Sequence, residues 1–491
     1  MNSKMSRWHV AWGILLLASG AVLFTNLGGY RPLTTHEVYV GQTSREMLAA
    51  GTWTTPRFLG EPRWQKPPLG YWQVMLTSSL AGESTTWLTR FPSALAGLAL
   101  VVLLTVWATR RFGRPIGWWT GFIQATSVGM LTQARLAEVD MTLTFLVALS
   151  LVSYSMAVRS TRWSRSLYRL FWLAMALSLL AKGPVGPFLI LPVVTLHAMW
   201  LPGKRHRWRW LDPVGIVLFL GVSLSWPVAV LMNEPNAWGV WRAEALGRFL
   251  RDPNGVVRIP FYYVVAALWL TLPWTPCWLA HWIRHARRRH SWRTLRAEDR
   301  LLVLWFLVPL VLLSLSGGKQ EHYLLPALAP MSIWSARWLS RLRLSWRPMA
   351  WPRWGVMRGP GLVPACALVV VIALAHGWVL PLVHGRHRAA NWARALAEHL
   401  EPGTSVEALG HSVLWLSFYV DAPLDRVDSL EEFFAKPSDR ARWVLTTRRV
   451  LRDVRPRYRV LKELAPLDAV DDKHQFVLAK LAPLPAPPAA N

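Results

Sequence analysis

Two carboxylates and two lysines stand out because each lies beside an apolar run long enough to cross a membrane. Glu37 follows the first such run and Asp140 begins a later one. Lys66 and Lys182 each precede a proline-containing turn, which fixes the backbone that presents them. Charged groups near the membrane plane are costly, so they tend to mark a site or a buried partner. A carboxylate can accept the proton of an attacking hydroxyl or stabilise a positively charged transition state, and an ammonium can hold a phosphate.

Structural roles compete with these chemical ones. Glu37 is placed to favour the N-terminus of a helix that begins near Val38, and Asp140 is placed to cap a helix that begins at Met141. A lysine beside an apolar run can also extend its ammonium group to lipid headgroups. The sequence leaves both kinds of role open, and one residue can fill both.

Further polar side chains stand at the ends of later apolar runs. Arg248 follows Glu244 by four residues, a spacing that suits either an ion pair on one helix face or a phosphate contact. Lys319, His322 and Tyr323 flank a short connection between two runs, and we include all three as candidate substrate-binding residues. A lone histidine such as His322 is more often a structural hydrogen bonder than a base.

No metal site is expected from the spacing. His36 and Glu37 are adjacent, so they face different directions on a helix. The remaining alternative is a divalent cation shared by Glu37 and Asp140. The two cysteines, Cys277 and Cys366, lie far apart inside apolar runs, so neither a disulfide nor a metal ligand set is indicated. No cofactor is therefore predicted.

The composition places the chain among membrane proteins. It has 491 residues, of which 53% are hydrophobic and only 17% charged. Repeated apolar runs of about 20 residues call for transmembrane helices. The net charge of +28 lies largely in short loops between those runs, where basic residues set orientation and attract anionic lipid. Nucleic-acid binding is accordingly not expected.

The elements that must position the polar residues are about eleven transmembrane helices. Basic loops alternate with poorly basic ones, which predicts a cytoplasmic N-terminus and an external C-terminus. The first run is read as a retained span, because no small-x-small cleavage site follows it. The run at 170–200 is interrupted at Lys182-Gly183-Pro184, which predicts two helices. The predicted spans are 8–27, 92–109, 117–134, 140–157, 170–200 as two, 213–232, 261–281, 301–316, 322–339 and 361–384.

Two segments outside the spans have their own patterns. The first external loop, about 29–91, carries stretches suited to interfacial helices at 38–50 and 69–80. We therefore predict a transmembrane catalytic domain over 1–384 and a small soluble α/β domain over 385–491 with a disordered Pro/Ala-rich tail. Within the latter, helix-like patterns occur at 391–400 and 429–435, and strand-like patterns at 442–446, 458–464 and 475–481.

Short stretches spread in order over residues 1–385 resemble the GT-C glycosyltransferases of the aminoarabinose (lipid A) transferase and dolichyl-phosphate-mannose protein mannosyltransferase type. These are THE at 35–37 with SREML at 44–48, QKPPLGYW at 65–72, RFPSALAG at 90–97, RLAEVD at 135–140, AKGP at 181–184, LGRF at 246–249 and KQEHYLLP at 319–326. The resemblance implies inverting transfer of a sugar from a polyprenyl-phosphate donor to an acceptor outside the inner membrane, with a periplasmic C-terminal domain.

Carried over by position, the resemblance implies that Lys66 holds the donor phosphate and that Asp140 is the second acidic residue. The first loop departs from the family: His36 stands where the family has its main aspartate, and Gln65 where it has a glutamate. Either His36 serves as the base, since its pKa lies near neutral pH, or Glu37 and Asp140 have taken over, or the chemistry has diverged.

Two other functions remain open at this point. One is a transporter or flippase for a lipid-linked saccharide, although transporters usually carry repeated halves and polar residues at mid-membrane. The other is a non-catalytic family member that binds polyprenyl lipid. The acceptor could be a lipid, a polysaccharide or a protein.

Overall fold

The computed structural model describes residues 2–201, 208–250, 261–287, 295–341, 362–383, 386–401, 403–420, 422–436, 440–465 and 475–484. Of residues 2–7, 244–250, 362–366, 383, 386–389 and 397 it describes the backbone alone. Several predicted features therefore lie outside the described residues. These are parts of the basic loops at 204–209, 284–300 and 341–358, the side chains of Glu244, Arg248 and Cys366, and most of the tail at 482–491.

The chain folds into two compact units, each assembled from segments that are separate in sequence. Unit 1 comprises Met1–Leu27, Trp64–Gln73 and Arg90–Ala375. Unit 2 comprises Gly28–Arg63, Val74–Thr89 and His376–Asn491, so most of the first predicted external loop packs with the C-terminal region.

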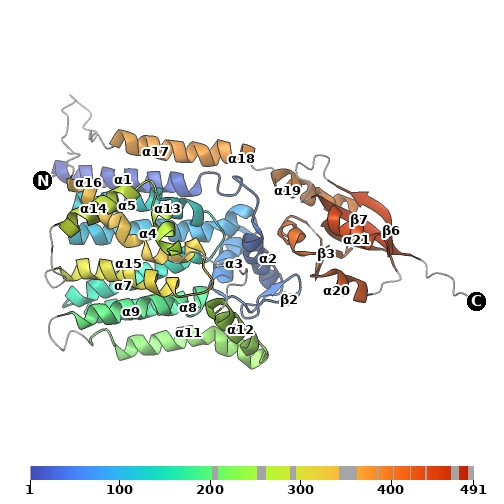
Figure 1. Cartoon of the computed structure of the whole chain (residues 1–491), viewed down its shortest axis with the longest axis horizontal. Coiled ribbons are helices and arrows are strands. Elements are labelled where there is room, and N and C mark those ends of the chain that lie inside the picture. Colours follow the sequence, from blue (N-terminus) through green and yellow to red (C-terminus); the bar gives the residue numbers. More distant parts are fainter. Residues whose placement is uncertain are drawn as a thin grey trace, which may run out of the picture. The chain divides into compact units, whose positions relative to one another are not determined.

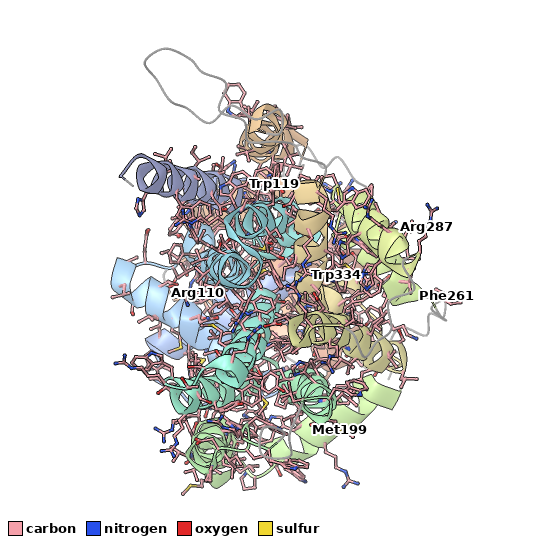
Figure 2. The ribbon with its side chains drawn as sticks, turned by 90° about the vertical axis from the view of Figure 1, so that its left-hand side faces the viewer. Arg110, Trp119, Met199, Phe261, Arg287 and Trp334 are labelled. Atoms are coloured by element: carbon pink, nitrogen blue, oxygen red, sulfur yellow. The ribbon has the colours of Figure 1, made fainter. Side chains whose placement is uncertain are left out.

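Unit 1 is a bundle of helices with a large apolar core, and its long helices run side by side (Figure 1). Its most extensive helix pairs join α7 to α8, α8 to α11, α5 to α16 and α14 to α16. Viewed end-on, Trp119 and Trp334 lie among these helices (Figure 2), and both are buried. The helices are α1 (Asn2–Phe24), α4 (Thr86–Phe112), α5 (Arg114–Thr126), α6 (Val128–Gln133), α7 (Asp140–Arg159), α8 (Ser164–Lys182), α9 (Val185–Met199), α11 (Pro213–Asn233), α12 (Ala237–Leu250), α13 (Tyr262–Leu270), α14 (Thr275–Arg287), α15 (Ala297–Ser314), η2 (Glu321–Ala327), α16 (Ala329–Arg341) and α17 (Leu362–Leu374).

Helices occur at every predicted span, but several are broken. The predicted pair within 170–200 is confirmed as α8 and α9, with Gly183 at a φ of +65°, which an L side chain rarely adopts. The run predicted as one span at 261–281 is instead α13 and α14, bent by 116°. The break contains Pro273, which has no N–H for an intrahelical bond. Similarly, the run at 117–134 divides at Ser127, whose backbone is extended.

Three helices in the described part of the chain are long and apolar enough to cross a membrane by length and composition, and the bent α13–α14 pair would make a fourth. These three are α4, α7 and α11. Shorter apolar helices lie at Trp8–Phe24, Val185–Met199 and Ala367–Leu382. The predicted number of eleven stays a prediction.

Two fully buried arginines donate hydrogen bonds to backbone carbonyls at the C-terminal end of α1 and just beyond it. Arg135 donates from Nη1 to the carbonyls of Val22 and Leu23, each at 2.9 Å, and from Nη2 to Thr25 at 2.7 Å. Arg90 donates to the Leu27 carbonyl at 3.0 Å. The last carbonyls of a helix have no intrahelical partner and carry partial negative charge, so a guanidinium satisfies both their hydrogen bonds and their charge.

Unit 2 contains a five-stranded mixed sheet in the order β4-β3-β5-β7-β6. β3 runs parallel to β4 and β5, whereas β7 runs antiparallel to β5 and β6. The strands are β3 (Val406–Leu409), β4 (Leu424–Val427), β5 (Arg442–Thr447), β6 (Tyr458–Leu464) and β7 (Phe476–Pro483), accompanied by α19 (Arg386–Ala395), η4 (Leu396–His399), η5 (His411–Leu416), α20 (Leu430–Ala435) and α21 (Arg448–Val454).

The N-terminal part of unit 2 adds α2 (Thr35–Ala49) and a two-stranded hairpin of β1 (Arg57–Phe58) and β2 (Glu61–Pro62). It also takes in most of α3 (Leu69–Ala81), whose first residues belong to unit 1. The π-helical turn η3 (Ala375–Val379) begins at the last residue of unit 1, and the rest of η3 and α18 (Leu380–Val383) belong to unit 2. The helices predicted at 38–50 and 69–80 are confirmed as α2 and α3.

Candidate active site

The centre of the site in unit 1 is an ion pair between Asp140 and Lys182. Asp140 is the first residue of α7, and Lys182 is the last residue of α8, which ends there because Gly183 leaves the helical conformation. The Lys182 Nζ donates to the Asp140 Oδ1, and both side chains are nearly buried, with exposed fractions of 11% and 8%. Burial of a charge is costly unless it is paired, which explains why these two residues meet.

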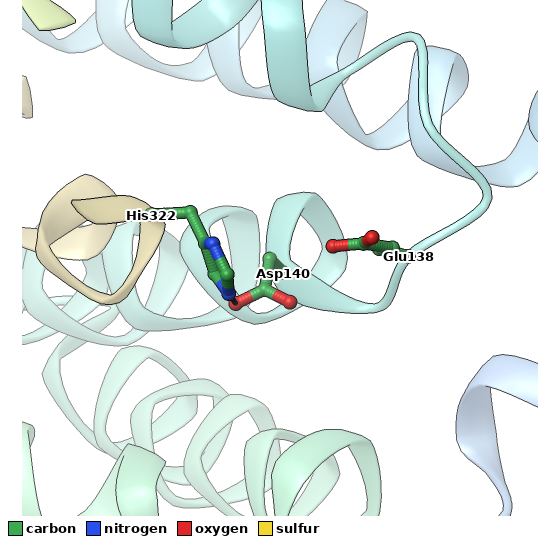
Figure 3. Close-up of side chains that lie close together, drawn as sticks. All are labelled: Glu138, Asp140 and His322. Carbon is green, nitrogen blue, oxygen red and sulfur yellow. Dashed lines mark ion pairs between the residues drawn. The ribbon is translucent and has the colours of Figure 1, made fainter. Parts of the chain in front are cut away.

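Residues of η2 complete the surroundings of this pair. His322 Nε2 lies 3.9 Å from Asp140 Oδ1 (Figure 3). The Lys182 ammonium lies 4.3 Å from the centre of the Tyr323 ring, a cation–π contact. The positive charge of Lys66 also interacts electrostatically with the Asp140 carboxyl group. These contacts bring together four residues that the sequence had singled out separately, namely Asp140, Lys182, His322 and Tyr323.

The loop before α7 is held by polar contacts on both sides. Ser93 Oγ donates to the Glu138 carbonyl at 2.8 Å, and Thr142 Oγ1 donates to Gln73 Oε1 at 3.0 Å. These bonds position Glu138, whose carboxylate points toward Asp140 (Figure 3). Glu138 was not predicted as a site residue; the signal that could have found it is the i, i+2 spacing of two acidic residues at the start of an apolar run.

Glu138, Asp140 and His322 form a group whose ligand atoms lie within 4.8 Å of one another, close enough to hold a metal ion. Carboxylate oxygens and an imidazole nitrogen suit a divalent cation. However, the Asp140 Oδ1 nearest to His322 already accepts from the Lys182 ammonium. A cation bound there would compete with Lys182 for that oxygen. Among the described residues, Glu138, Asp140 and His322 are therefore the candidate metal ligands. This set differs from the pair considered from the sequence, in which Glu37 and Asp140 share a divalent cation.

Glu37 in unit 2 has the structural role that the sequence left open. Its carboxylate accepts from the Thr34 N–H at 2.9 Å, and its own N–H donates to Thr34 Oγ1 at 3.3 Å. This reciprocal pair is a capping box at the N-terminus of α2. Arg31 lies 3.6 Å from the same carboxylate, and the Glu37 side chain is fully buried. His36 is exposed, with its ring centre 6.4 Å from that of Tyr39.

The capping role considered for Asp140 is not what the structure shows. The residue before α7 is Val139, which makes no side-chain capping bond, and the Asp140 carboxylate points to Lys182 instead. Asp140 and Glu37 therefore have different structural roles, although both stand at the start of a helix beside an apolar run. Of the other predicted residues, Lys319 is half-buried beside η2, and the Arg248 side chain lies outside the described residues.

Glu46 is a polar residue of the first loop that sequence reasoning did not single out by role. Its carboxylate accepts from the Leu59 N–H at 2.8 Å and the Gly60 N–H at 3.2 Å, and also from Gln42 at 2.9 Å. It therefore fastens the turn between β1 and β2 to α2. These contacts give a structural role to Glu46, the acidic residue of the SREML stretch.

Comparison with known proteins shows which family this part of the chain resembles. Residues 13–239, which include Lys66, Asp140 and Lys182, match the family model described as dolichyl-phosphate-mannose-protein mannosyltransferase. This part of the chain is similar to that family. The resemblance expected from the sequence is thereby confirmed.

Two curated relatives are undecaprenyl phosphate-alpha-4-amino-4-deoxy-L-arabinose arabinosyl transferases. That of Pseudomonas aeruginosa strain UCBPP-PA14 is 31% identical over 384 residues, covering 76% of this chain and 66% of the relative. Transferase 2 of Pseudomonas fluorescens strain Pf-5 is 30% identical over 345 residues, covering 68% of this chain and 56% of the relative. The matched region thus spans between half and two thirds of these relatives.

The fold is shared almost end to end with ArnT from Cupriavidus metallidurans. The apo structure of that protein matches with a TM-score of 0.78 at 19% identity, covering 96% of this chain and 98% of the other. Its structure bound to undecaprenyl phosphate matches with a TM-score of 0.76. The chain therefore has the helical fold of the GT-C membrane glycosyltransferases.

Proposed function

We propose that this protein is a membrane glycosyltransferase that moves a sugar from an undecaprenyl-phosphate donor to an acceptor, with inversion at the anomeric carbon. The observation that carries the proposal is the Asp140–Lys182 pair, with His322 beside it and the charge of Lys66 acting on it. Of these residues, Lys66, Asp140 and Lys182 lie inside the region that matches the mannosyltransferase family. The names of the curated relatives support an aminopentose as the sugar.

In this reaction an acceptor hydroxyl attacks the anomeric carbon from the face opposite the phosphate. The bond from that carbon to the phosphate oxygen breaks, and its electron pair leaves with undecaprenyl phosphate. Lys66 and Lys182 supply positive charge for the phosphate, and Lys182 also orients Asp140. Asp140 stabilises the positive charge that develops on the sugar and takes the proton of the acceptor hydroxyl.

A phosphate is already a good leaving group, so the carboxylate need not be a strong base. This makes an ion-paired aspartate adequate for the task, and His322 at 3.9 Å is placed to help position it. The Glu37 carboxylate is already hydrogen-bonded in the capping box of α2, which favours Asp140 over Glu37 as the catalytic carboxylate. A catalytic role for Glu37 or His36 stays a prediction, as do the contacts of Lys319 and Arg248 with substrate.

The setting that fits this function is the bacterial inner membrane, with a cytoplasmic N-terminus and the soluble part of unit 2 in the periplasm. The alternation of basic and poorly basic loops supports that orientation. The acceptor on that side is a lipid, a polysaccharide or a protein.

The test is a mass comparison of envelope lipids, polysaccharides and proteins from a deletion strain complemented with wild type, Asp140→Asn or Lys66→Ala. We expect one fraction to lose a sugar-sized mass in the deletion strain and in both variants, with a fall in turnover of about 100-fold or more. Asp212→Asn is the matched control, because Asp212 also forms an ion pair, with Arg169 at 3.5 Å, but caps α11.

The results of this experiment test the site assignment and the transferase proposal separately. Wild-type product in both the Asp140→Asn and Lys66→Ala strains would overturn the site assignment. No difference between the deletion and wild-type strains in any fraction would overturn the transferase proposal itself and favour a lipid-binding protein without activity.

A further inference from the structure

Unit 2 contains a pocket of about 470 Å³ that the proposed chemistry does not use. It lies wholly within that unit, between α2, the start of α4 and the segment around η5. Its size falls in the range of small-molecule sites. The lining residues are Gly28, Arg45, Ser84, Thr85, Thr86, Trp87, Arg394, Phe418, Tyr419 and Val420.

We propose that this pocket binds a phosphorylated saccharide. Eight of the ten described lining residues are of three kinds: two arginines, three serine or threonine residues and three aromatic residues. Gly28 and Val420 complete the described lining, which contains no acidic residue. Guanidinium groups bind phosphate oxygens in a bidentate manner. Hydroxyl side chains can both donate to and accept from sugar hydroxyls, and aromatic faces cover the apolar face of a sugar ring.

Each arginine donates to a neutral group and lies against an aromatic ring of the pocket wall. Arg45 donates from both terminal nitrogens to the Phe418 carbonyl at 3.3 Å, and its guanidinium lies 4.3 Å from the Phe418 ring centre. Arg394 donates to Asn391 at 2.7 Å and lies 4.9 Å from the Tyr419 ring centre. Rings and guanidinium groups thus lie side by side, which is the arrangement that a ligand with both an anionic group and a sugar ring requires.

The walls are fixed by close packing between segments distant in sequence. A Cβ on Gly41 would lie 2.9 Å from Phe418, so α2 reaches that ring only because residue 41 is glycine. The Leu33 N–H donates to the Tyr419 hydroxyl at 2.7 Å, and Gly28 lies directly against Trp87. The Trp87 side chain is 41% exposed, so a large part of its surface can contact a ligand. A pocket held in this way is preorganised, which lowers the entropic cost of binding.

Binding can be tested on the full-length protein in phosphatidylcholine nanodiscs by saturation-transfer NMR. The probe is glucosamine 1-phosphate, compared with glucosamine and with inorganic phosphate. We expect glucosamine 1-phosphate to bind at least tenfold more tightly than either. Arg394→Gln and Trp87→Ala should each weaken it about tenfold. Arg452→Gln on α21 removes an exposed charge outside the pocket and should leave binding unchanged.

Equal binding of the probe to wild type and to both pocket variants would overturn the proposal. Inorganic phosphate binding as tightly as glucosamine 1-phosphate, with no effect of Trp87→Ala, would likewise overturn the saccharide part. Vesicles of phosphatidylcholine with a phosphorylated glycolipid separate the two sources of this chemistry. Competition by them supports a lipid headgroup as ligand, and its absence alongside tight probe binding supports a free sugar phosphate. Neither result depends on transferase activity.

Discussion

At the scale of single residues, two acidic side chains with similar sequence settings have different surroundings. Glu37 and Asp140 both stand at the start of a helix beside an apolar run. Glu37 forms a capping box with Thr34, whereas Asp140 pairs with Lys182 at the end of another helix. The difference arises from a partner 42 residues away in sequence, and helix-start patterns carry no information about such a partner.

The Asp140–Lys182 pair leads to a prediction in which the effects on stability and on catalysis are measured separately. Lys182→Met or Asp140→Asn alone leaves a buried charge without its partner and should destabilise the protein by about 3–5 kcal/mol. The double variant Asp140→Asn/Lys182→Met should recover most of the thermal stability but none of the turnover. Unfolding of the purified protein in detergent and the envelope mass comparison give the two readouts.

The control for this double variant is Arg455→Met. Arg455 pairs with Glu463 at 2.9 Å but is 54% exposed, so its loss should change the stability by less than about 1 kcal/mol. Sugar transfer by the double variant at the wild-type rate would contradict a catalytic role for Asp140.

At the scale of elements, hydrophobic periodicity located nearly every helix. It located α2, α3, α19, α20 and strands β5 to β7 as well. It did not locate the break at Ser127 or the bend between α13 and α14, since no acidic or basic residue (Asp, Glu, Lys or Arg) interrupts either predicted span. It also missed β3 and β4, which have four residues each and lie in parallel pairs. Such short segments offer too few positions for a period to emerge.

The arginines at the end of α1 lead to a prediction at this scale. Arg135→Leu removes the donors to three carbonyls and should lower the melting temperature, because each buried carbonyl left unsatisfied costs about 1–3 kcal/mol. Arg135→Lys should recover only part of the lost stability, since one ammonium group cannot donate to all three carbonyls with the geometry of the planar guanidinium group. Thermal unfolding in detergent is the measurement, with the exposed Arg162→Leu as control. Equal melting temperatures for Arg135→Leu and wild type would refute the capping role.

At the scale of the whole molecule, charge distribution predicts orientation in the membrane. The loop that contains Arg162 should be cytoplasmic, and Arg452 on α21 should be periplasmic. In a background with Cys277 and Cys366 changed to serine, a membrane-impermeant maleimide should label Arg452→Cys in spheroplasts. Arg162→Cys should react only after the membrane is permeabilised. The reverse pattern would contradict the orientation.

The closure of α1 by Arg90 and Arg135 also bears on how the chain is made. Helix α1 leaves the ribosome before Arg90 and Arg135 do, and its last carbonyls then have no donor, because Arg135 follows more than a hundred residues later. Until α4 and the segment after α6 join it, the end of α1 must stay near water or headgroups. Assembly of the bundle is therefore coupled to synthesis of the chain as far as Arg135, because the carbonyls at the end of α1 are satisfied only when these later segments dock against it.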